Sequence, residues 1–278
     1  MNLFAGPYDH EFGHELFSFQ GHVRYLSKKY DKVAVCSKPS MEFLYQDFVD
    51  TFVPLGEDLS KYEDYHKVTK EDCHNHVSAG AGNVNLEQEF VSYGNKSSGQ
   101  GYDIIFHART KEWGMCKNLE NDVYDLVANE LNKNYKVAFM GTKDASYCPS
   151  GIEDLRNKPL NNLADDIASS SLVVGQSSGP IHFASLCRTP HLTWGGYRLR
   201  TFARYTHHWN PFKTPCYLYE AGEGTGQENY ISNRIRSGAR VPRDILEKGH
   251  VNIIKIKNYR EPREEDLLHS INNILNKK

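Results

Sequence analysis

Several proton-transfer side chains lie close together near the start of the chain. The stretch "GPYDHEFGHE" follows a short apolar run and contains Asp9, His10, Glu11, His14 and Glu15. Carboxylates and imidazoles are the groups that most often move protons in catalysis. Asp9 and Glu11 could instead complement a helix dipole, but that alternative leaves both histidines without a role. The stretch therefore predicts a site that removes a proton, with Asp9 or Glu11 as the base and His10 and Glu15 as further catalytic candidates.

A turn of small residues separates a strand pattern from a helix pattern in the second half of the chain. The stretch "VVGQSSGPIHFASLC" passes from apolar residues through Ser-Ser-Gly-Pro into helical spacing. Pro180 suits the first turn of a helix, and Ser177 or Ser178 suits its N-cap. The free amides of such a helix start bind anions, most often phosphate. We therefore expect a phosphate site at Ser177, Ser178, Gly179 and His182, the alternative being a capped helix without a ligand.

Two other predicted strand ends could add positive charge and room for a ligand. The stretch "FHARTKEWGMCKN" offers Arg109, Lys111 and Lys117, and "MGTKD" places Gly141 and Thr142 in a turn. An arginine can hold two phosphate oxygens at once, and a lysine adds a point charge. Ligands of doubly wound sheets bind at the carboxyl ends of the strands. We therefore expect these residues and the Ser-Ser-Gly-Pro turn to line one binding site for a phosphate-containing ligand.

Strand and helix patterns alternate along most of the chain and predict an α/β protein. In the first half, strands are expected at 2–5, 32–37 and 51–53, with a helix at 14–30. In the second half, strands are expected at 103–110, 135–141, 172–176, 191–194 and 251–257, and helices at 121–134, 160–171, 179–187 and 263–278. Such alternation is typical of parallel sheets with helices on both faces.

The Gly/Ser-rich stretch "YGNKSSGQGY" predicts a linker at Tyr93–Tyr102. The expected domains are residues 1–98 and 99–278, two Rossmann-like domains facing a cleft, with a helix at the C-terminus. Asp165 and Asp166, inside "LADDIA", are expected on a solvated helix face.

The two motifs together resemble a known family. "GPYDHEFGHEL" and "SSGPIHFASLCRTPHLTW" are similar to the acceptor-side opening and the donor-binding segment of small GT-B glycosyltransferases related to the heptosyltransferases. The resemblance implies that the first domain binds the acceptor and supplies the base, while the second binds the nucleotide sugar. It also implies inversion at the anomeric carbon. Heptosyltransferases usually have Asp-Thr or Asp-Ser where this chain has Ser177-Ser178.

Composition limits the class of protein and its expected compartment. The chain has 278 residues, of which 39% are hydrophobic and 24% charged, as in ordinary globular proteins. We expect no transmembrane segment and no signal peptide, and hence a cytoplasmic protein. Six cysteines without a CxxC pair suit free thiols. "DCHNH" is a weak zinc signal and no Asp-x-Asp motif stands at a suitable place, so metal-independent transfer is expected, without a cofactor beyond the nucleotide sugar.

Positive charge is concentrated late in the chain. Residues 196–263 contain 13 Lys/Arg against 6 Asp/Glu, whereas residues 1–195 contain 18 against 26. Arginines alternate there with aromatic residues, a pattern typical of polyanion binding. We expect Arg198, Arg200, Arg204 and Trp209 to bind an anionic acceptor, either a nucleic acid with a hydroxylated base or an anionic glycan. Alternatively, these arginines pair with the acidic first half.

These observations favour a glycosyltransferase that moves a sugar from a nucleotide-diphosphate donor to a hydroxyl. A nucleotide-sugar epimerase of the same fold would explain the second half equally well. A non-catalytic polyanion-binding module would explain the basic segment, but it leaves the proton-transfer cluster without a purpose.

Overall fold

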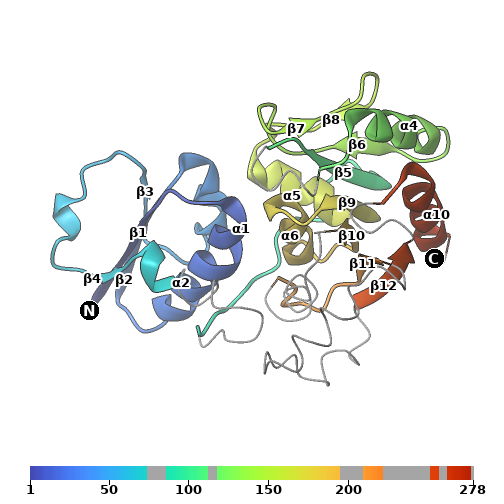
Figure 1. Ribbon diagram of the computed structural model, residues 1–278. Coiled ribbons are helices and arrows are strands. Elements are labelled where there is room, and N and C mark those ends of the chain that lie inside the picture. The colour runs from blue at the N-terminus through green and yellow to red at the C-terminus, as the bar shows by residue number, and fades with distance from the viewer. Residues whose placement is uncertain (74–85, 112–117, 195–208, 222–250, 257–261, 277–278) are drawn as a thin grey trace. The chain divides into compact units, whose positions relative to one another are not determined.

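The chain divides into two compact units, Met1–Val91 and Ser92–Lys278. The computed structural model describes residues 1–73, 86–111, 118–194, 209–221, 251–256 and 262–276. Each unit has its own parallel sheet with helices packed on it (Figure 1). The division falls a few residues before the expected boundary at 98/99.

The first unit is built on a four-stranded parallel sheet. Its strand order is β3-β2-β1-β4, and the strands are β1 (Asn2–Tyr8), β2 (Lys32–Ser37), β3 (Thr51–Pro54) and β4 (His66–Val68). The 3-10 helices η2 (Pro39–Leu44) and η3 (Ser60–Tyr62) lie in the connections. Residues of β1 alternate between the two faces, so that Phe4 packs with Tyr62 on one of them, their ring centroids 4.8 Å apart.

One helical stretch follows β1 and changes its geometry within its length. It consists of α1 (Phe12–His14), the π-helix η1 (Glu15–Phe19) and α2 (Gln20–Ser27). Leu16, Phe19 and Val23 are fully buried along it, and the Phe19 ring lies 4.6 Å from that of Tyr8. A π-turn widens a helix locally and often marks a functional segment. Here the widened turn begins at Glu15, one of the predicted catalytic candidates.

The second unit is built on a larger sheet with the strand order β12-β11-β10-β9-β5-β6-β8. All these pairs are parallel, and β7 joins β5 antiparallel. The strands are β5 (Ile104–Arg109), β6 (Val137–Phe139), β7 (Ser146–Tyr147), β8 (Glu153–Asp154), β9 (Leu172–Gln176), β10 (His191–Trp194), β11 (Cys216–Ala221) and β12 (Val251–Ile256). This confirms the predicted α/β class, although β4, β7, β8 and β11 were not predicted.

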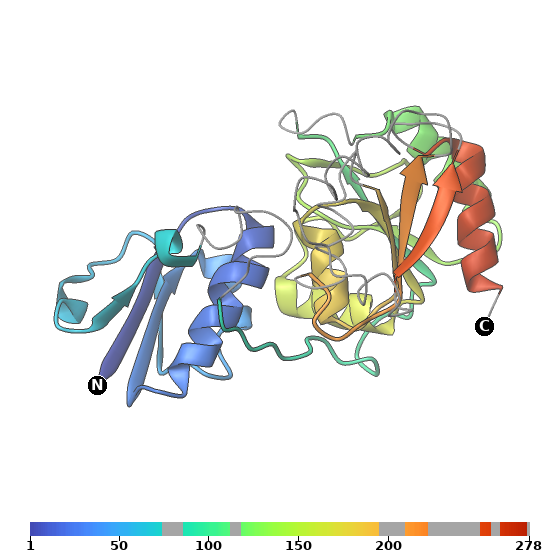
Figure 2. The ribbon, with the colours of Figure 1, turned by 60° about the horizontal axis from the view of Figure 1, so that its bottom comes forward.

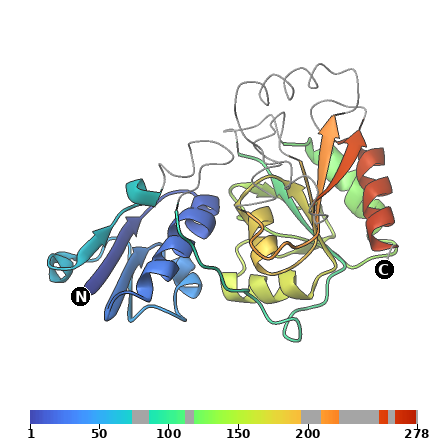
Figure 3. The ribbon, with the colours of Figure 1, turned by 90° about the horizontal axis from the view of Figure 1, so that it is seen from below.

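Helices cover both faces of the second sheet (Figures 2 and 3). They are α4 (Asn121–Leu131), α5 (Leu160–Ser169), α6 (Gly179–Leu186) and the predicted C-terminal helix α10 (Glu264–Leu275). One core joins α4 and α10 to the sheet and includes Phe106, Tyr124, Phe139 and Ile271. The helices α5 and α6 pack on the other face, where Ile167 and Phe183 are fully buried. No helix among the described residues is long and apolar enough to cross a membrane.

The predicted linker is packed against α5. Asp165 Oδ1 accepts a hydrogen bond from the amide of Asn95 (2.7 Å), and Asp166 Oδ1 accepts one from that of Gln100 (3.1 Å). Asp166 is 2% exposed and pairs with Lys158, so the expected solvated face was wrong at this position. Small residues are needed in this segment because its backbone lies close to α5. A Cβ on Gly94 would stand only 2.8 Å from the Cβ of Ala168 in that helix.

Candidate functional site

Three predicted stretches meet at one edge of the second sheet. Strand β5 pairs with β6 on one side and with β9 on the other, all three parallel. Their carboxyl ends therefore lie side by side, and the residues that follow them share one edge. These are Arg109 at the end of β5, Gly141 and Thr142 after β6, and Ser177–Gly179 after β9.

The start of α6 leaves backbone amides without helical partners. Ser178 is the N-cap, and the first helical bond runs from the amide of His182 to the Ser178 carbonyl (3.0 Å). The amides of Gly179 and Ile181 precede that bond and so have no acceptor within the helix, while Pro180 has no N–H. Two N–H groups and the positive end of the helix dipole thus face the same place.

Ser178 does not cap the helix with its side chain. Its hydroxyl donates to the Gln176 carbonyl (2.9 Å) and lies 3.0 Å from Nδ1 of His107. The His107 ring is buried, and this burial, with Arg109 and Lys111 nearby, lowers its pKa to about 3. His107 was not predicted as a site residue, although its place two residues before Arg109 at a strand end was a usable signal.

Gln176 ties the end of β9 to the end of β5. Its side chain is fully buried, with Nε2 donating to the Arg109 carbonyl (3.1 Å). Its Oε1 accepts from the Arg109 amide and from the Tyr124 hydroxyl, both at 3.3 Å. An amide that bridges two strand ends in this way fixes their spacing. Gln176 was also missed by the sequence analysis, which treated it as part of the strand.

The guanidinium of Arg109 shapes the loop after β5. Its Nη1 donates to the Lys111 carbonyl and to Asn118 Oδ1, each at 2.9 Å. Arg109 therefore builds the loop that carries Lys111, which is exposed. Lys117, the third cation predicted here, lies outside the described residues.

The turn after β6 fits closely around its neighbours. Gly141 has φ +131°, which favours glycine, and a Cβ there would stand 3.0 Å from His107 Cδ2 and 2.8 Å from Ser146 Cβ. The Thr142 carbonyl accepts a hydrogen bond from Ser146 Oγ (2.7 Å). Glycine at 141 thus allows the turn to approach His107.

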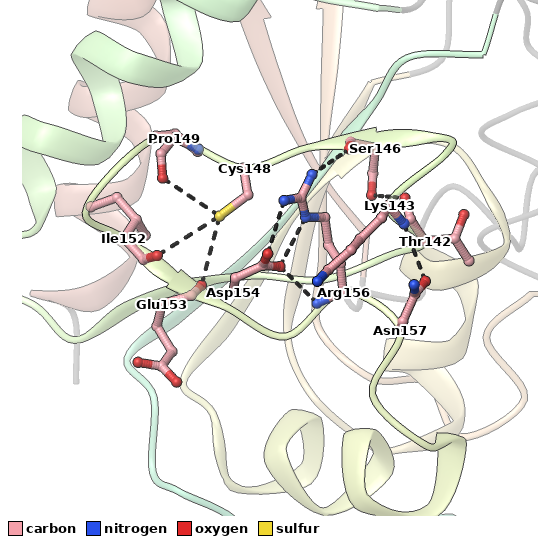
Figure 4. A network of polar contacts seen from close by, with 10 residues as sticks. All are labelled: Thr142, Lys143, Ser146, Cys148, Pro149, Ile152, Glu153, Asp154, Arg156 and Asn157. Carbon is pink, nitrogen blue, oxygen red and sulfur yellow. Dashed lines mark hydrogen bonds and ion pairs between the residues drawn. The ribbon is translucent and has the colours of Figure 1, made fainter.

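A network of polar contacts connects this turn to the neighbouring strand β8 and the residues after it (Figure 4). Arg156 binds Asp154 through two hydrogen bonds of 2.8 Å and donates a third from Nη1 to the Ser146 carbonyl (2.9 Å). The guanidinium holds the pKa of Asp154 down, to about 2. Asn157 Oδ1 accepts from the amide of Lys143 (3.1 Å). The network holds the strand edge and the turn in a fixed relation.

The remaining candidates of this unit are buried or outside the described residues. His182 is 4% exposed, and its ring lies against that of Trp209, with the centroids 3.9 Å apart. Trp209 is itself buried, so one face of its ring is already occupied by a protein ring. The amide of Ser177 donates to the Trp194 carbonyl (2.7 Å). Arg198, Arg200 and Arg204 lie outside the residues that the structure describes.

The proton-transfer candidates of the first unit separate into two environments. Asp9, His10 and Glu11 are exposed and follow β1. Asp9 forms an ion pair with Lys70 (2.7 Å), and this contact lowers the pKa of Asp9. Among the described residues, the Glu11 carboxylate has no hydrogen-bond or ion-pair partner. Of the two predicted bases, Glu11 is thus the one whose side chain is available to a substrate.

Glu15 is enclosed in the core of the first unit. Its side chain is fully buried, and Oε1 accepts hydrogen bonds from Ser37 and from the Tyr45 hydroxyl (2.9 Å). No described residue binds Oε2. Burial raises the pKa of Glu15 to about 7, against the lowering effect of the two hydroxyls. This environment separates Glu15 from the exposed group at Asp9, His10 and Glu11, with which the sequence analysis had placed it.

The raised pKa of Glu15 predicts a pH-dependent stability of the first unit. The folded state keeps a proton on Glu15 that the unfolded chain loses above about pH 4.5. The proton stabilises the folded state fully below about pH 4.5, and this stabilisation is lost as the pH rises through about 7. The free energy of unfolding falls by about 3 kcal/mol over this range. We expect Glu15→Gln, measured by thermal unfolding between about pH 5 and pH 8, to flatten this dependence. Glu11→Gln, at the exposed N-cap of the same helical stretch, is the control, and an equally steep profile for Glu15→Gln would contradict the assignment.

Comparison with known proteins shows likeness of structure at low sequence identity. E. coli ADP-heptose LPS heptosyltransferase II matches over 99% of this chain and 98% of its own, with TM-score 0.58 and 14% identity. A glycosyl transferase family 9 protein from Veillonella parvula matches over 100% and 97%, with TM-score 0.57 and 11% identity. No protein-family model matches the chain, and no curated protein matches its sequence.

A third match is partial. The iron-containing dodecameric glycosyltransferase TibC of enterotoxigenic E. coli matches over 71% of this chain, with TM-score 0.52 and 13% identity. The match spans 58% of TibC, which has also been solved in complex with ADP-D-β-D-heptose. These likenesses confirm the predicted fold: the chain has the GT-B fold of the family 9 heptosyltransferases.

Proposed function

We propose that this protein is a GT-B glycosyltransferase that moves a sugar from a nucleotide-diphosphate donor to an acceptor hydroxyl. The observation that carries the proposal is the start of α6, where the amides of Gly179 and Ile181 have no helical partner. Their place at the carboxyl edge of a parallel sheet is where such sheets bind nucleotides. The complex of TibC with ADP-D-β-D-heptose supports a nucleotide-diphosphate sugar as the donor.

The chemistry of transfer requires positive charge at the leaving diphosphate. The amides at the start of α6 and the Lys111 cation would stabilise that charge as the glycosidic bond breaks. They would supply what a metal ion supplies in other transferases, so we propose metal-independent transfer. The proposed donor site is pre-formed, because Gln176 binds Arg109 and Ser178 contacts His107, and both contacts join the end of β9 to that of β5.

In the first unit, we propose Glu11 as the general base. Its exposed carboxylate follows β1, while Asp9 is engaged by Lys70. As Glu11 takes the proton of the acceptor hydroxyl, the oxygen would bond to the anomeric carbon on the face opposite the diphosphate, whose bond to that carbon breaks. This single displacement inverts the anomeric configuration. Glu15 would serve the structure of this unit instead, since its carboxyl is enclosed.

The acceptor is proposed to be an anionic polymer. The supporting observation is the excess of 13 Lys/Arg over 6 Asp/Glu in residues 196–263, which is more than one diphosphate needs. A nucleic acid with a hydroxylated base and an anionic glycan both fit this charge. Both acceptors present hydroxyl groups to a transferase.

Donor binding is tested by titrating ADP-, UDP-, GDP- and CMP-sugars by calorimetry. We expect a diphosphate-linked sugar to bind more tightly than the CMP-sugar, which carries one phosphate. Ser178→Ala should weaken that binding by about two- to tenfold, because it removes the hydrogen bond that ties the turn before α6 to His107 of β5, and one hydrogen bond is worth about 0.5–1.5 kcal/mol. Thr189→Ala, which removes a buried hydroxyl in the turn after α6, is the control. Equal affinity for all four sugars would contradict the diphosphate site, and turnover of donor without acceptor would identify an epimerase.

The base is tested by comparing Glu11→Gln with Asp9→Asn. General base catalysis contributes about 10²–10⁴-fold, so Glu11→Gln should lower kcat by about that factor and leave donor affinity unchanged. Asp9→Asn, which keeps the shape of the side chain and weakens its contact with Lys70, should lower kcat much less. The reverse order of the two kcat values would assign the base to Asp9.

The acceptor is tested by transfer of labelled sugar onto DNA that contains hydroxymethylcytosine, with plain DNA as the control. An anionic glycan and a neutral oligosaccharide complete the panel. We expect transfer to one anionic polymer, and a steep loss of its binding as salt is raised. Transfer to the neutral oligosaccharide alone would contradict an anionic acceptor and leave the transferase proposal standing.

A further inference from the structure

The hydroxyl of Ser178 makes two contacts with a single hydrogen. Its Oγ lies 2.9 Å from the Gln176 carbonyl oxygen and 3.0 Å from Nδ1 of His107. A carbonyl cannot donate, so the hydroxyl hydrogen must lie between the two oxygens, which would otherwise repel each other. The second contact then requires a hydrogen on the imidazole, with Nδ1 of His107 donating to Ser178 Oγ.

The imidazole of His107 is neutral, and its single ring hydrogen is on Nδ1. Its ring is buried near the end of β5, and the cations that bear on it are Arg109, the last residue of β5, and Lys111 on the following loop. Burial and these charges both disfavour a second proton. With its one hydrogen on Nδ1, the ring keeps Nε2 as an acceptor.

This hydrogen bond determines what Ser178 does at the start of α6. A serine at an N-cap normally accepts a hydrogen bond from the second or third amide of its helix. Here the second residue is Pro180, which has no N–H, and Ser178 makes no side-chain bond to the helix. The bond from His107 draws the hydroxyl toward β5, and the amide of Ile181 is left for another acceptor.

The surroundings of His107 are built to its shape. A Cβ on Gly141 would stand 3.0 Å from His107 Cδ2, and a Cβ on Gly175 would stand 2.5 Å from the His107 carbonyl oxygen. The strand ends β6 and β9 thus approach β5 only because both positions are glycine. His107 lies at the centre of the three strand ends that form the proposed donor site.

We infer that His107 is a positioning residue of the donor site: its Nδ1–H holds Ser178 away from α6 and keeps the amides of Gly179 and Ile181 open for a diphosphate. The ligand in this inference rests on the proposed function, but the hydrogen bond does not. His107 acts through Ser178 and does not itself touch the reacting atoms.

The hydrogen bond is tested by NMR of protein labelled with ¹⁵N-histidine, with His107 assigned from the His107→Asn variant. We expect a neutral ring with hydrogen on Nδ1 and none on Nε2, and no titration between about pH 5.5 and pH 8. A hydrogen on Nε2 with a bare Nδ1, or a charged ring in that range, would overturn the inference.

The positioning role is tested by binding of ADP, UDP and GDP to two variants. His107→Phe keeps the ring and loses the donor, so the tightest-binding diphosphate should bind about tenfold more weakly. His107→Asn places an amide N–H near the position of Nδ1 and should restore most of that loss. In sugar transfer, donor KM should follow the same order while kcat changes little. Thermal unfolding confirms that each variant is folded.

The outcomes separate this inference from the function on which it rests. Wild-type affinity in folded His107→Phe would overturn the positioning role. A wild-type protein that shows the expected tautomer and binds none of the three diphosphates would overturn the proposed function and, with it, the ligand assigned here.

Discussion

The open start of helix α6 is the feature on which the rest of the second unit depends. Two amides without helical partners are costly unless something accepts from them. The surrounding residues keep them open: Pro180 removes one donor, and Ser178 is held by Gln176 and contacts His107. Strand pairing brings the residues of the proposed site together, because β5 pairs with both β6 and β9. The two glycines near His107 then allow the three strand ends to converge.

In each unit, burial favours the uncharged form of one polar side chain. In the second, burial beside cations keeps His107 uncharged, which fixes the direction of one hydrogen bond. In the first, burial favours the protonated form of Glu15, despite donors from Ser37 and Tyr45. The exposed carboxylate of Glu11 retains the freedom that proton transfer needs. Burial thus distinguishes Glu15 from the exposed Glu11, for which we propose the role of general base.

Periodicity predicted most of the fold, and the motifs drew attention to three strand ends that lie at one edge of the second sheet. The strands at Leu172–Gln176 and His191–Trp194 and the helix between them followed directly from apolar spacing. The Gly/Ser-rich composition predicted a linker, whereas small residues such as Gly94 are needed there because the backbone packs against α5. Short or aromatic-rich strands such as β11 show too little alternation of apolar and polar residues to be recognised from the sequence. His107 and Gln176 were missed because their roles arise from pairing between β5 and β9, which are far apart in sequence.

The central claim is that the amides at the start of α6 bind the diphosphate of the donor. The most direct measurement is the change in backbone amide chemical shifts on titration with the tightest-binding nucleoside diphosphate. The account predicts the largest changes at Gly179 and Ile181, with smaller ones along β5 and none at the far end of α6. Saturable binding whose largest changes fall elsewhere, with Gly179 and Ile181 unmoved, would contradict it.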